Sequence, residues 1–291
     1  MPAAVSPVAL PGHALRDGRP VLDLSGPKLR RALETLVRAC EEQGGVEAFA
    51  AVLKLKSQAF QTVLVDEGRS GLDLDRFGHL VRTMATVRRR FAPLVQAVGW
   101  SHLRSSVADL LEGAHDTATA DRRMAAFCSG LAGDGRATRE CRFVRDLAAE
   151  ILHNVLPEQY PLMHRWVWDS RANTGVLREI WHGDDVDAMI IDVPDSYETF
   201  LVLREELSQF LADNGVFRDM LWYVDLLQAQ VYAGYINAQG GAYLRTDFAC
   251  EGDPLEQTRR LLGIDGVGLK SSRSLVTTLE GAATSSEPPQ D

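Results

Sequence analysis

The stretch PKLRRALETLVRACEEQ, residues 27–43, repeats apolar residues at the three- and four-residue spacing of a helix. The positions that form this apolar stripe are Leu29, Leu33, Leu36, Val37 and Cys40. Charged residues occupy the opposite side. The segment therefore predicts an amphipathic helix that buries one face.

Helical periodicity continues through most of the chain. Further helices are predicted in residues 46–68, 72–98 with a break near Pro93, 101–111, 120–131, 141–155, 195–214 and 216–236. Asp195 followed by Glu198 is typical of a capping box, and Gly215 predicts the end of the same helix. Only AMIIDV, residues 188–193, has a strand-like pattern, and one short strand does not make a sheet. The predicted fold class is all-α, a compact multi-helix globular bundle.

Composition divides the chain into four parts. Residues 1–25 are proline-rich and predict a flexible leader, and residues 281–291 are polar and predict a disordered tail. Between them lie an N-terminal helical half, 26–131, and a C-terminal helical half, 139–280, joined by a loop rich in Gly, Thr and Arg. The two halves form either one domain or two.

Hydrophobic residues make up 45% of the 291 residues, enough for a sizeable core. No apolar run approaches the roughly 20 residues that a membrane-spanning helix needs. The four cysteines, Cys40, Cys128, Cys141 and Cys250, lie far apart without CxxC spacing. This pattern indicates reduced thiols and a cytoplasmic protein.

Charge is distributed unevenly between the halves. Residues 1–150 contain 21 Lys and Arg against 18 Asp and Glu, whereas residues 151–291 contain 10 against 22. The acidic second half would repel a nucleic-acid backbone unless a local basic patch overcame it. It would also suit docking to a basic protein partner.

Two Glu-x-x-His patterns suggest a metal site: Glu150 with His153, and Glu179 with His182. Residues three apart share a helix face, and the pattern resembles the ligand motif of helical-bundle di-iron carboxylate proteins. The resemblance implies iron or another divalent metal as cofactor, with these four side chains as ligands. The remaining carboxylates would come from Glu205, Glu206 or Asp225.

Both pairs have an alternative interpretation that needs no metal. His153 lies four residues before Pro157, and His182 is followed at once by Gly183. Each histidine is thus close to a predicted helix C-terminus, where an imidazole can bind free carbonyls.

The region 150–185 also predicts a pocket for a small ligand, because it combines tryptophans with acids. The predicted pocket residues are Arg165, Trp166, Trp168, Asp169, Trp181, Asp184 and Asp185. The acids near residue 185 lack the glycine and closing glutamate of an EF-hand loop. The alternative is that the tryptophans belong to the core and the acids to a solvated loop.

RRLLGIDGVGLKSSRSLVTTL, residues 259–279, resembles the helix-hairpin-helix motif that binds DNA. In that interpretation Gly266 and Gly268 bring backbone N–H groups close to a phosphate, and Lys270 supplies charge. Glycosylases with this motif carry a catalytic Asp after the hairpin, but the only Asp after Asp265 is Asp291. No catalytic residue can be assigned. The competing interpretation is a glycine-rich turn before a surface helix.

The sequence leaves three functional classes open. The first is a protein that binds a metal ion or small ligand at 150–185, with a metal-dependent oxidoreductase as its enzymatic form; whether the protein is an enzyme stays undecided. The second is a nucleic-acid-associated protein that uses residues 259–279. The third is a regulatory or protein-interaction module. Walker, nucleotide-binding and serine-hydrolase motifs are absent from the sequence.

Overall fold

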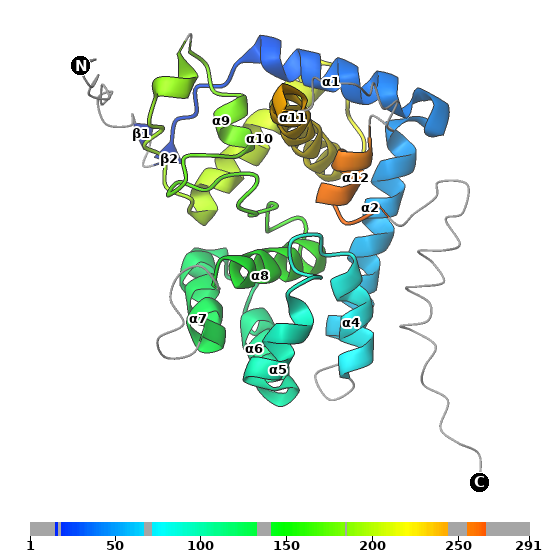
Figure 1. Ribbon diagram of the computed structural model, residues 1–291, viewed down its shortest axis with the longest axis vertical. Coiled ribbons are helices and arrows are strands. Elements are labelled where there is room, and N and C mark those ends of the chain that lie inside the picture. The colour runs from blue at the N-terminus through cyan, green and yellow to red at the C-terminus, as the bar shows by residue number, and fades with distance from the viewer. Residues whose placement is uncertain are drawn as a thin grey trace.

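The computed structural model describes residues 15–16, 19–66, 72–132, 141–183, 185–243 and 255–265. Helices account for most of them (Figure 1). The α-helices are α1 (Gly26–Cys40), α2 (Gly45–Gln61), α4 (Leu74–Arg82), α5 (Phe91–Val98), α6 (Trp100–Leu111), α7 (Ala120–Ala132), α8 (Cys141–Val155), α9 (Val176–Glu179), α10 (Tyr197–Asp213), α11 (Met220–Tyr243) and α12 (Glu256–Leu261). Shorter elements are the 3₁₀ turns Glu41–Gln43, Thr117–Thr119 and Val186–Ala188, a π-helical turn at Thr62–Asp66, and the paired strands β1 (Leu15–Arg16) and β2 (Arg19–Pro20).

Helix α8 lies across the middle of the molecule (Figure 1). On one side of it are α4 to α7, on the other are α1 and α9 to α12, and α2 runs along one edge beside both groups. Four polar residues of α8 are buried with its apolar ones: Asp146, Glu150, His153 and Asn154. Because buried polar groups need partners, this helix places the main internal polar cluster at the centre of the fold.

The two predicted halves share one hydrophobic core. Helix α8 of the second half packs against α2, α6 and α7 of the first, and α1 packs against α11. The buried apolar residues of both halves form a single cluster. The predicted all-α, compact architecture is confirmed.

The predicted helix over residues 72–98 is two helices in the structure. Helix α4 ends at Arg82, turns follow, and α5 begins only at Phe91. Pro93 is not the break, because it lies in the first turn of α5, where its missing N–H would have no helical partner.

The start of α10 differs from the predicted capping box by one residue. Ser196, not Asp195, is the N-cap residue. Asp195 instead accepts a hydrogen bond from Arg145 of α8 and another from Ser170 at 3.1 Å. The prediction of the helix end at Gly215 is confirmed, because this glycine takes a φ of 86° directly after the helix.

Part of the predicted leader is packed against the body. The backbone N–H of Ser25 donates to the carbonyl of Ile180 at 2.7 Å, and that of His182 donates to the carbonyl of Asp23 at 2.8 Å. Residues 19–25 therefore belong to the fold. The predicted tail, 281–291, lies outside the described residues.

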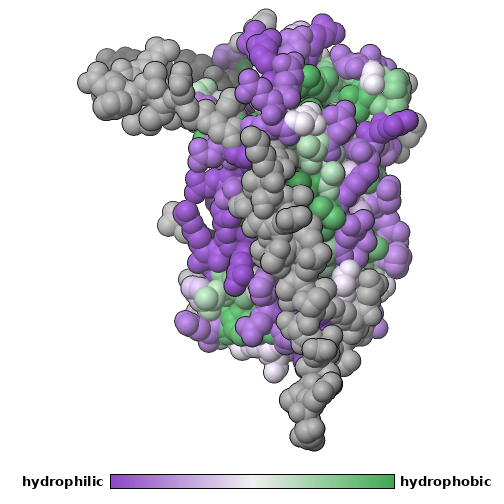
Figure 2. Space-filling view, turned by 90° about the vertical axis from the view of Figure 1, so that its right-hand side faces the viewer, coloured by the Kyte–Doolittle hydropathy of each residue, from purple (hydrophilic) through white to green (hydrophobic). Residues whose placement is uncertain are grey.

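The described part of the face seen in Figure 2 is mostly hydrophilic, with hydrophobic residues in narrow patches. No helix within the described ranges combines the length and apolar character needed to cross a membrane.

Candidate functional site

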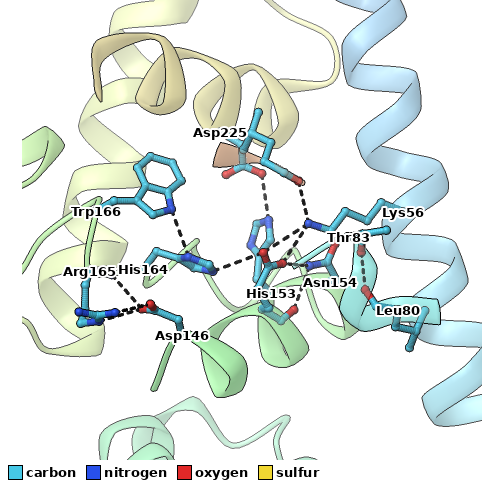
Figure 3. Close-up of polar contacts among 12 residues, drawn as sticks. Lys56, Leu80, Thr83, Asp146, His153, Asn154, His164, Arg165, Trp166 and Asp225 are labelled. Carbon is cyan, nitrogen blue, oxygen red and sulfur yellow. Dashed lines mark hydrogen bonds and ion pairs between the residues drawn. The ribbon is translucent and has the colours of Figure 1, made fainter. Parts of the chain in front are cut away.

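Side chains from three helices meet at a buried polar cluster (Figure 3). Lys56 comes from α2, Glu150, His153 and Asn154 from α8, and Asp225 from α11. Each is at most 5% exposed. The helix period explains why Lys56 is here, since it lies on the same stripe of α2 as the buried residues before and after it.

Lys56 and Glu150 form a buried ion pair. The ammonium Nζ lies 3.1 Å from Oε2 of Glu150 and 3.4 Å from Oε1. It also donates to the carbonyl of Leu262 at 2.9 Å. Burial by itself would raise the pKa of Glu150, but the nearby Lys56 ammonium, with a smaller contribution from the His153 imidazolium, outweighs it, and the pKa lies below its ordinary value.

His153 donates from both ring nitrogens. Nδ1 lies 2.8 Å from the carbonyl of Tyr160, and Nε2 lies 2.9 Å from Oδ2 of Asp225. Since a carbonyl and a carboxylate both accept, the ring is an imidazolium. Burial would lower its pKa, but Asp225 and the Tyr160 carbonyl have the larger combined effect and raise the pKa of His153.

His164 is in the opposite protonation state. The indole Nε1 of Trp166 donates to Nδ1 of His164 at 3.1 Å, so this nitrogen carries a lone pair. The proton of the neutral ring is on Nε2, which lies 3.6 Å from Oε1 of Glu150. Burial lowers the pKa of His164, and Glu150 and Asp146 only partly oppose this.

A second ion pair fixes the segment after α8. Arg165 lies 2.8 Å from Oδ2 of Asp146 through Nη2, and its Nε and backbone N–H both lie 3.3 Å from Oδ1. The carboxylate is almost fully buried, whereas the Arg165 side chain is 27% exposed. This pair holds the tryptophan-containing segment against α8.

Space inside the cluster is small. Lys56, Glu150, His153 and Asp225 line a cavity of about 10 Å³ together with Leu262 and other residues of α2, α8, α11 and α12. That volume accommodates about one water molecule. The arrangement can hold protons and fixed charges at defined atoms, but it does not provide a chamber for an organic ligand.

A larger cleft, of about 440 Å³, lies between α6 and α7, and no predicted site residue lines it. Arg123 borders it and donates to the carbonyl of Leu110 at 3.0 Å and to that of Asp109 at 3.2 Å. Its guanidinium therefore binds the end of α6. Arg122, also on the cleft, is exposed.

The four predicted metal ligands do not form one constellation. Glu150 and His153 face the buried cluster, whereas the His182 side chain is 67% exposed and lies 3.6 Å from Asp23. Glu179 ends the short helix α9. Among the residues that the structure describes, no group of three or more His, Cys, Asp or Glu side chains could hold a metal ion. Of the additional carboxylates considered, Asp225 does lie beside His153.

The predicted pocket residues form packed core and turns. Trp166, Trp168 and Trp181 are buried, and the indole of Trp168 donates to the carbonyl of Val193 at 2.9 Å. Asp169 accepts from the backbone N–H of Ala172 at 3.1 Å and lies 3.7 Å from Arg142. Asp185 is exposed, and Asp184 lies outside the described residues.

Sequence reasoning missed Lys56 and His164. Lys56 had a usable signal, because it interrupts the apolar stripe of its helix between Leu53 and Phe60. A charged residue on a buried stripe predicts a buried partner. His164 had no comparable pattern, since it lies in an irregular segment.

The segment 255–265 docks onto this cluster. Leu262 binds Lys56 through its carbonyl, and both carboxylate oxygens of Asp265 accept from Arg88, at 2.9 and 2.7 Å. Gly263 lies so close to the end of α4 that a Cβ on it would be 1.6 Å from the carbonyl oxygen of Thr83. Gly266, Gly268 and Lys270 of the helix-hairpin-helix-like sequence lie just beyond the described residues.

Segment 255–265 meets a part of the chain that is strongly basic. Residues 76–108 contain six arginines and no Asp or Glu. Arg89 and Arg90 are exposed directly after Arg88, and Arg260 is exposed on α12. Arg89 and Arg90 follow Arg88 directly in the chain, with the Arg90 guanidinium 5.6 Å from the centre of the Phe143 ring, and Arg260 helps to lower the pKa of Asp265. We call Arg89, Arg90 and Arg260 the arginine cluster.

No family model, curated protein or solved structure matches this chain.

Proposed function

We propose that the protein binds nucleic acid, most simply duplex DNA, through the arginine cluster and the helix-hairpin-helix-like sequence 259–279. The observation that carries this proposal is the bidentate contact between Arg88 and Asp265. It holds the start of the glycine-rich sequence beside exposed arginines. Backbone N–H groups and arginines close together are what phosphate binding requires.

The charge distribution supports an oriented encounter with nucleic acid. The chain as a whole has a formal charge of −9, but its 76–108 segment has only positive formal charges. A phosphate backbone would be attracted to the basic region and repelled by acidic parts of the second half. Residue Asp265 does not oppose binding strongly, because Arg88 neutralises it.

The buried cluster gives less support to a metal or small-ligand function. Lys56, Glu150, His153 and Asp225 bind one another, and the cavity between them holds about one water. A ligand would have to displace these ion pairs, which is costly in a buried site. The acidic charge of the second half would suit a basic protein partner, but the Arg88–Asp265 contact gives the nucleic-acid proposal a more specific basis.

Fluorescence anisotropy with a labelled duplex of about two helical turns, roughly 20 base pairs, tests the proposal. Binding is expected to weaken steeply as salt rises, because each neutralised phosphate contributes about 0.9 to the slope of log K against log salt. The double variant Arg89→Glu/Arg260→Glu is expected to bind at least about tenfold more weakly with a shallower slope.

The matched control is Arg30→Glu/Arg31→Glu. It makes the same change in charge on exposed residues of α1, which lies at the opposite end of the molecule from α4 and α5 (Figure 1). Its affinity should stay within about threefold of the unmodified protein, as expected for a general field effect. Absence of binding at low salt, or equal weakening in both variants, would overturn the proposal.

A further inference from the structure

Segment 255–265 is attached to the body through buried apolar contacts and one buried charge. Leu255, Leu262 and Ile264 are at most 3% exposed. Thr258 donates to the side-chain carbonyl of Gln230 on α11 at 2.9 Å. The apolar contacts favour packing of the segment against the body but do not fix its orientation, whereas hydrogen bonds are directional and do fix it.

The Lys56 ammonium is the buried charge that reaches the segment. Its acceptor, the carbonyl of Leu262, belongs to the C-cap residue directly after α12. Carbonyls at a helix end lack helical partners and need another donor. Lys56 supplies that donor with a full charge, and charge-assisted bonds are shorter and stronger than neutral ones.

Glu150 makes the charged form of Lys56 tolerable inside the protein. Its Oε2 also accepts from the side-chain amide of Asn154 at 2.8 Å, which fixes the carboxylate on α8. The pair is thus built into two helices of the body, α2 and α8, and contacts the segment through one carbonyl (Figure 3).

We infer that Lys56 is a positioning residue for segment 255–265, whose residues 259–265 are the described start of the proposed nucleic-acid-binding sequence. Its bond to Leu262 fixes where the chain leaves α12, and Gly263 then passes against Thr83 to bring Asp265 to Arg88. Lys56 touches no nucleic acid itself, because it is only 3% exposed. This inference rests on the proposed function, although its structural part can be measured separately.

Hydrogen exchange tests the structural part. The double variant Lys56→Met/Glu150→Gln removes both charges and keeps side chains of similar size. The amides of Leu262, Gly263 and Ile264, which bond within the segment, are expected to exchange at least about tenfold faster. The amides of α10, which do not contact Lys56, should change by less than about threefold.

The matched control is Ser57→Ala. Ser57 is the neighbour of Lys56 on α2 and donates to the Asn154 carbonyl at 2.7 Å, but this contact does not involve the segment. The Ser57→Ala variant should not accelerate hydrogen exchange in segment 255–265 more than in α10. Should the double variant fail to fold, Lys56→Gln keeps an amide donor without charge and is expected to show a smaller selective increase.

Duplex binding by the same variants tests the functional part. The double variant should bind at least about tenfold more weakly while circular dichroism shows it folded, and Ser57→Ala should bind like the unmodified protein. Unchanged exchange of the segment, or equal acceleration in α10, would overturn the positioning role. If the unmodified protein binds no duplex, the proposed function fails, but the exchange result still decides whether Lys56 positions the segment.

Discussion

His153 of α8 and Asp225 of α11 form an ion pair that is buried at both ends, with 2.9 Å between Nε2 and Oδ2. The pair links the central helix to the helix against which the segment 255–265 packs. The other ring nitrogen of His153, Nδ1, donates to the carbonyl of Tyr160, so the imidazolium also anchors the chain just after α8. A single protonated ring thus ties three parts of the fold together.

The raised pKa of His153 predicts a loss of stability at alkaline pH. The folded state holds the proton more tightly than the unfolded chain, whose histidine titrates near its ordinary value of 6.5. The stabilisation is therefore complete below that value and is lost as pH rises through the raised pKa. Urea unfolding of the unmodified protein and of His153→Gln should show that their difference in unfolding free energy shrinks with rising pH.

The control for this pH dependence is Asp225→Asn. It removes the main partner that raises the pKa, and leaves a buried imidazole in its neutral form. We expect this variant to have an unfolding free energy about 3 kcal/mol lower at neutral pH, which is typical of breaking a buried ion pair. A difference between the unmodified protein and His153→Gln that stays constant from acid to alkaline pH would contradict the assigned imidazolium.

Trp166→Phe is predicted to change the tautomer of His164. The indole bond keeps Nδ1 of His164 free of a proton, and a phenyl ring cannot make it. Nitrogen NMR should show a single Nε2–H tautomer in the unmodified protein and a mixture in the variant. The lost bond and the smaller ring together should cost about 1–3 kcal/mol.

Trp168→Phe separates this effect from loss of packing. Trp168 is also buried, but its indole donates to the Val193 carbonyl and not to a ring. This variant should lose comparable stability and keep the His164 tautomer. The same tautomer mixture in both variants would show that packing, and not the indole bond, sets the protonation site.

Periodicity predicted the helices well because most residues of the apolar stripes face the core, although Val37 of the first stripe is 43% exposed. Residues 141–155 and the region of α11 were predicted from spacing alone, and both form helices there. The break between α4 and α5 was misplaced, because Pro93 has a stronger sequence signal than the turns after Arg82. Local signals of this kind do not report the tertiary contacts that end a helix.

The candidate site was harder to predict because its partners are distant in sequence. Glu150 and His153 were predicted as metal ligands on one helix face, and in the structure they form ion pairs with Lys56 and Asp225. A spacing rule pairs residues within a helix and says nothing about partners that lie 94 and 72 positions away in the sequence, as these do. His182 also fits the Glu-x-x-His spacing, but its side chain is exposed and does not reach the buried cluster.

Gly234→Ala is predicted to stabilise the protein. Gly234 is exposed on α11, and a Cβ added there would meet no atom within 4 Å. Alanine lowers the entropy of the unfolded chain and favours helix, so the unfolding free energy should rise by about 0.5–1 kcal/mol. Thermal unfolding measures this. Gly175→Ala should instead destabilise, because its Cβ would lie 2.6 Å from the Val167 carbonyl oxygen.

Gly263→Ala is predicted to detach segment 255–265 from α4. The residue has a φ of 70°, which disfavours any side chain, and its Cβ would overlap the Thr83 carbonyl oxygen. Backbone cannot move aside as a flexible side chain can, so the Arg88–Asp265 contact should break. We expect faster hydrogen exchange of the segment's amides and weaker duplex binding, with the rest of the protein folded.

Gly215→Ala is the matched control for Gly263→Ala: its φ of 86° is similar, but no atom lies within 4 Å of the added Cβ. The Gly215→Ala variant should lower the unfolding free energy by about 1 kcal/mol. Hydrogen exchange of segment 255–265 and duplex binding should stay unchanged. If the two alanine variants behave alike, backbone strain alone explains the effect, and close packing of the segment against Thr83 does not.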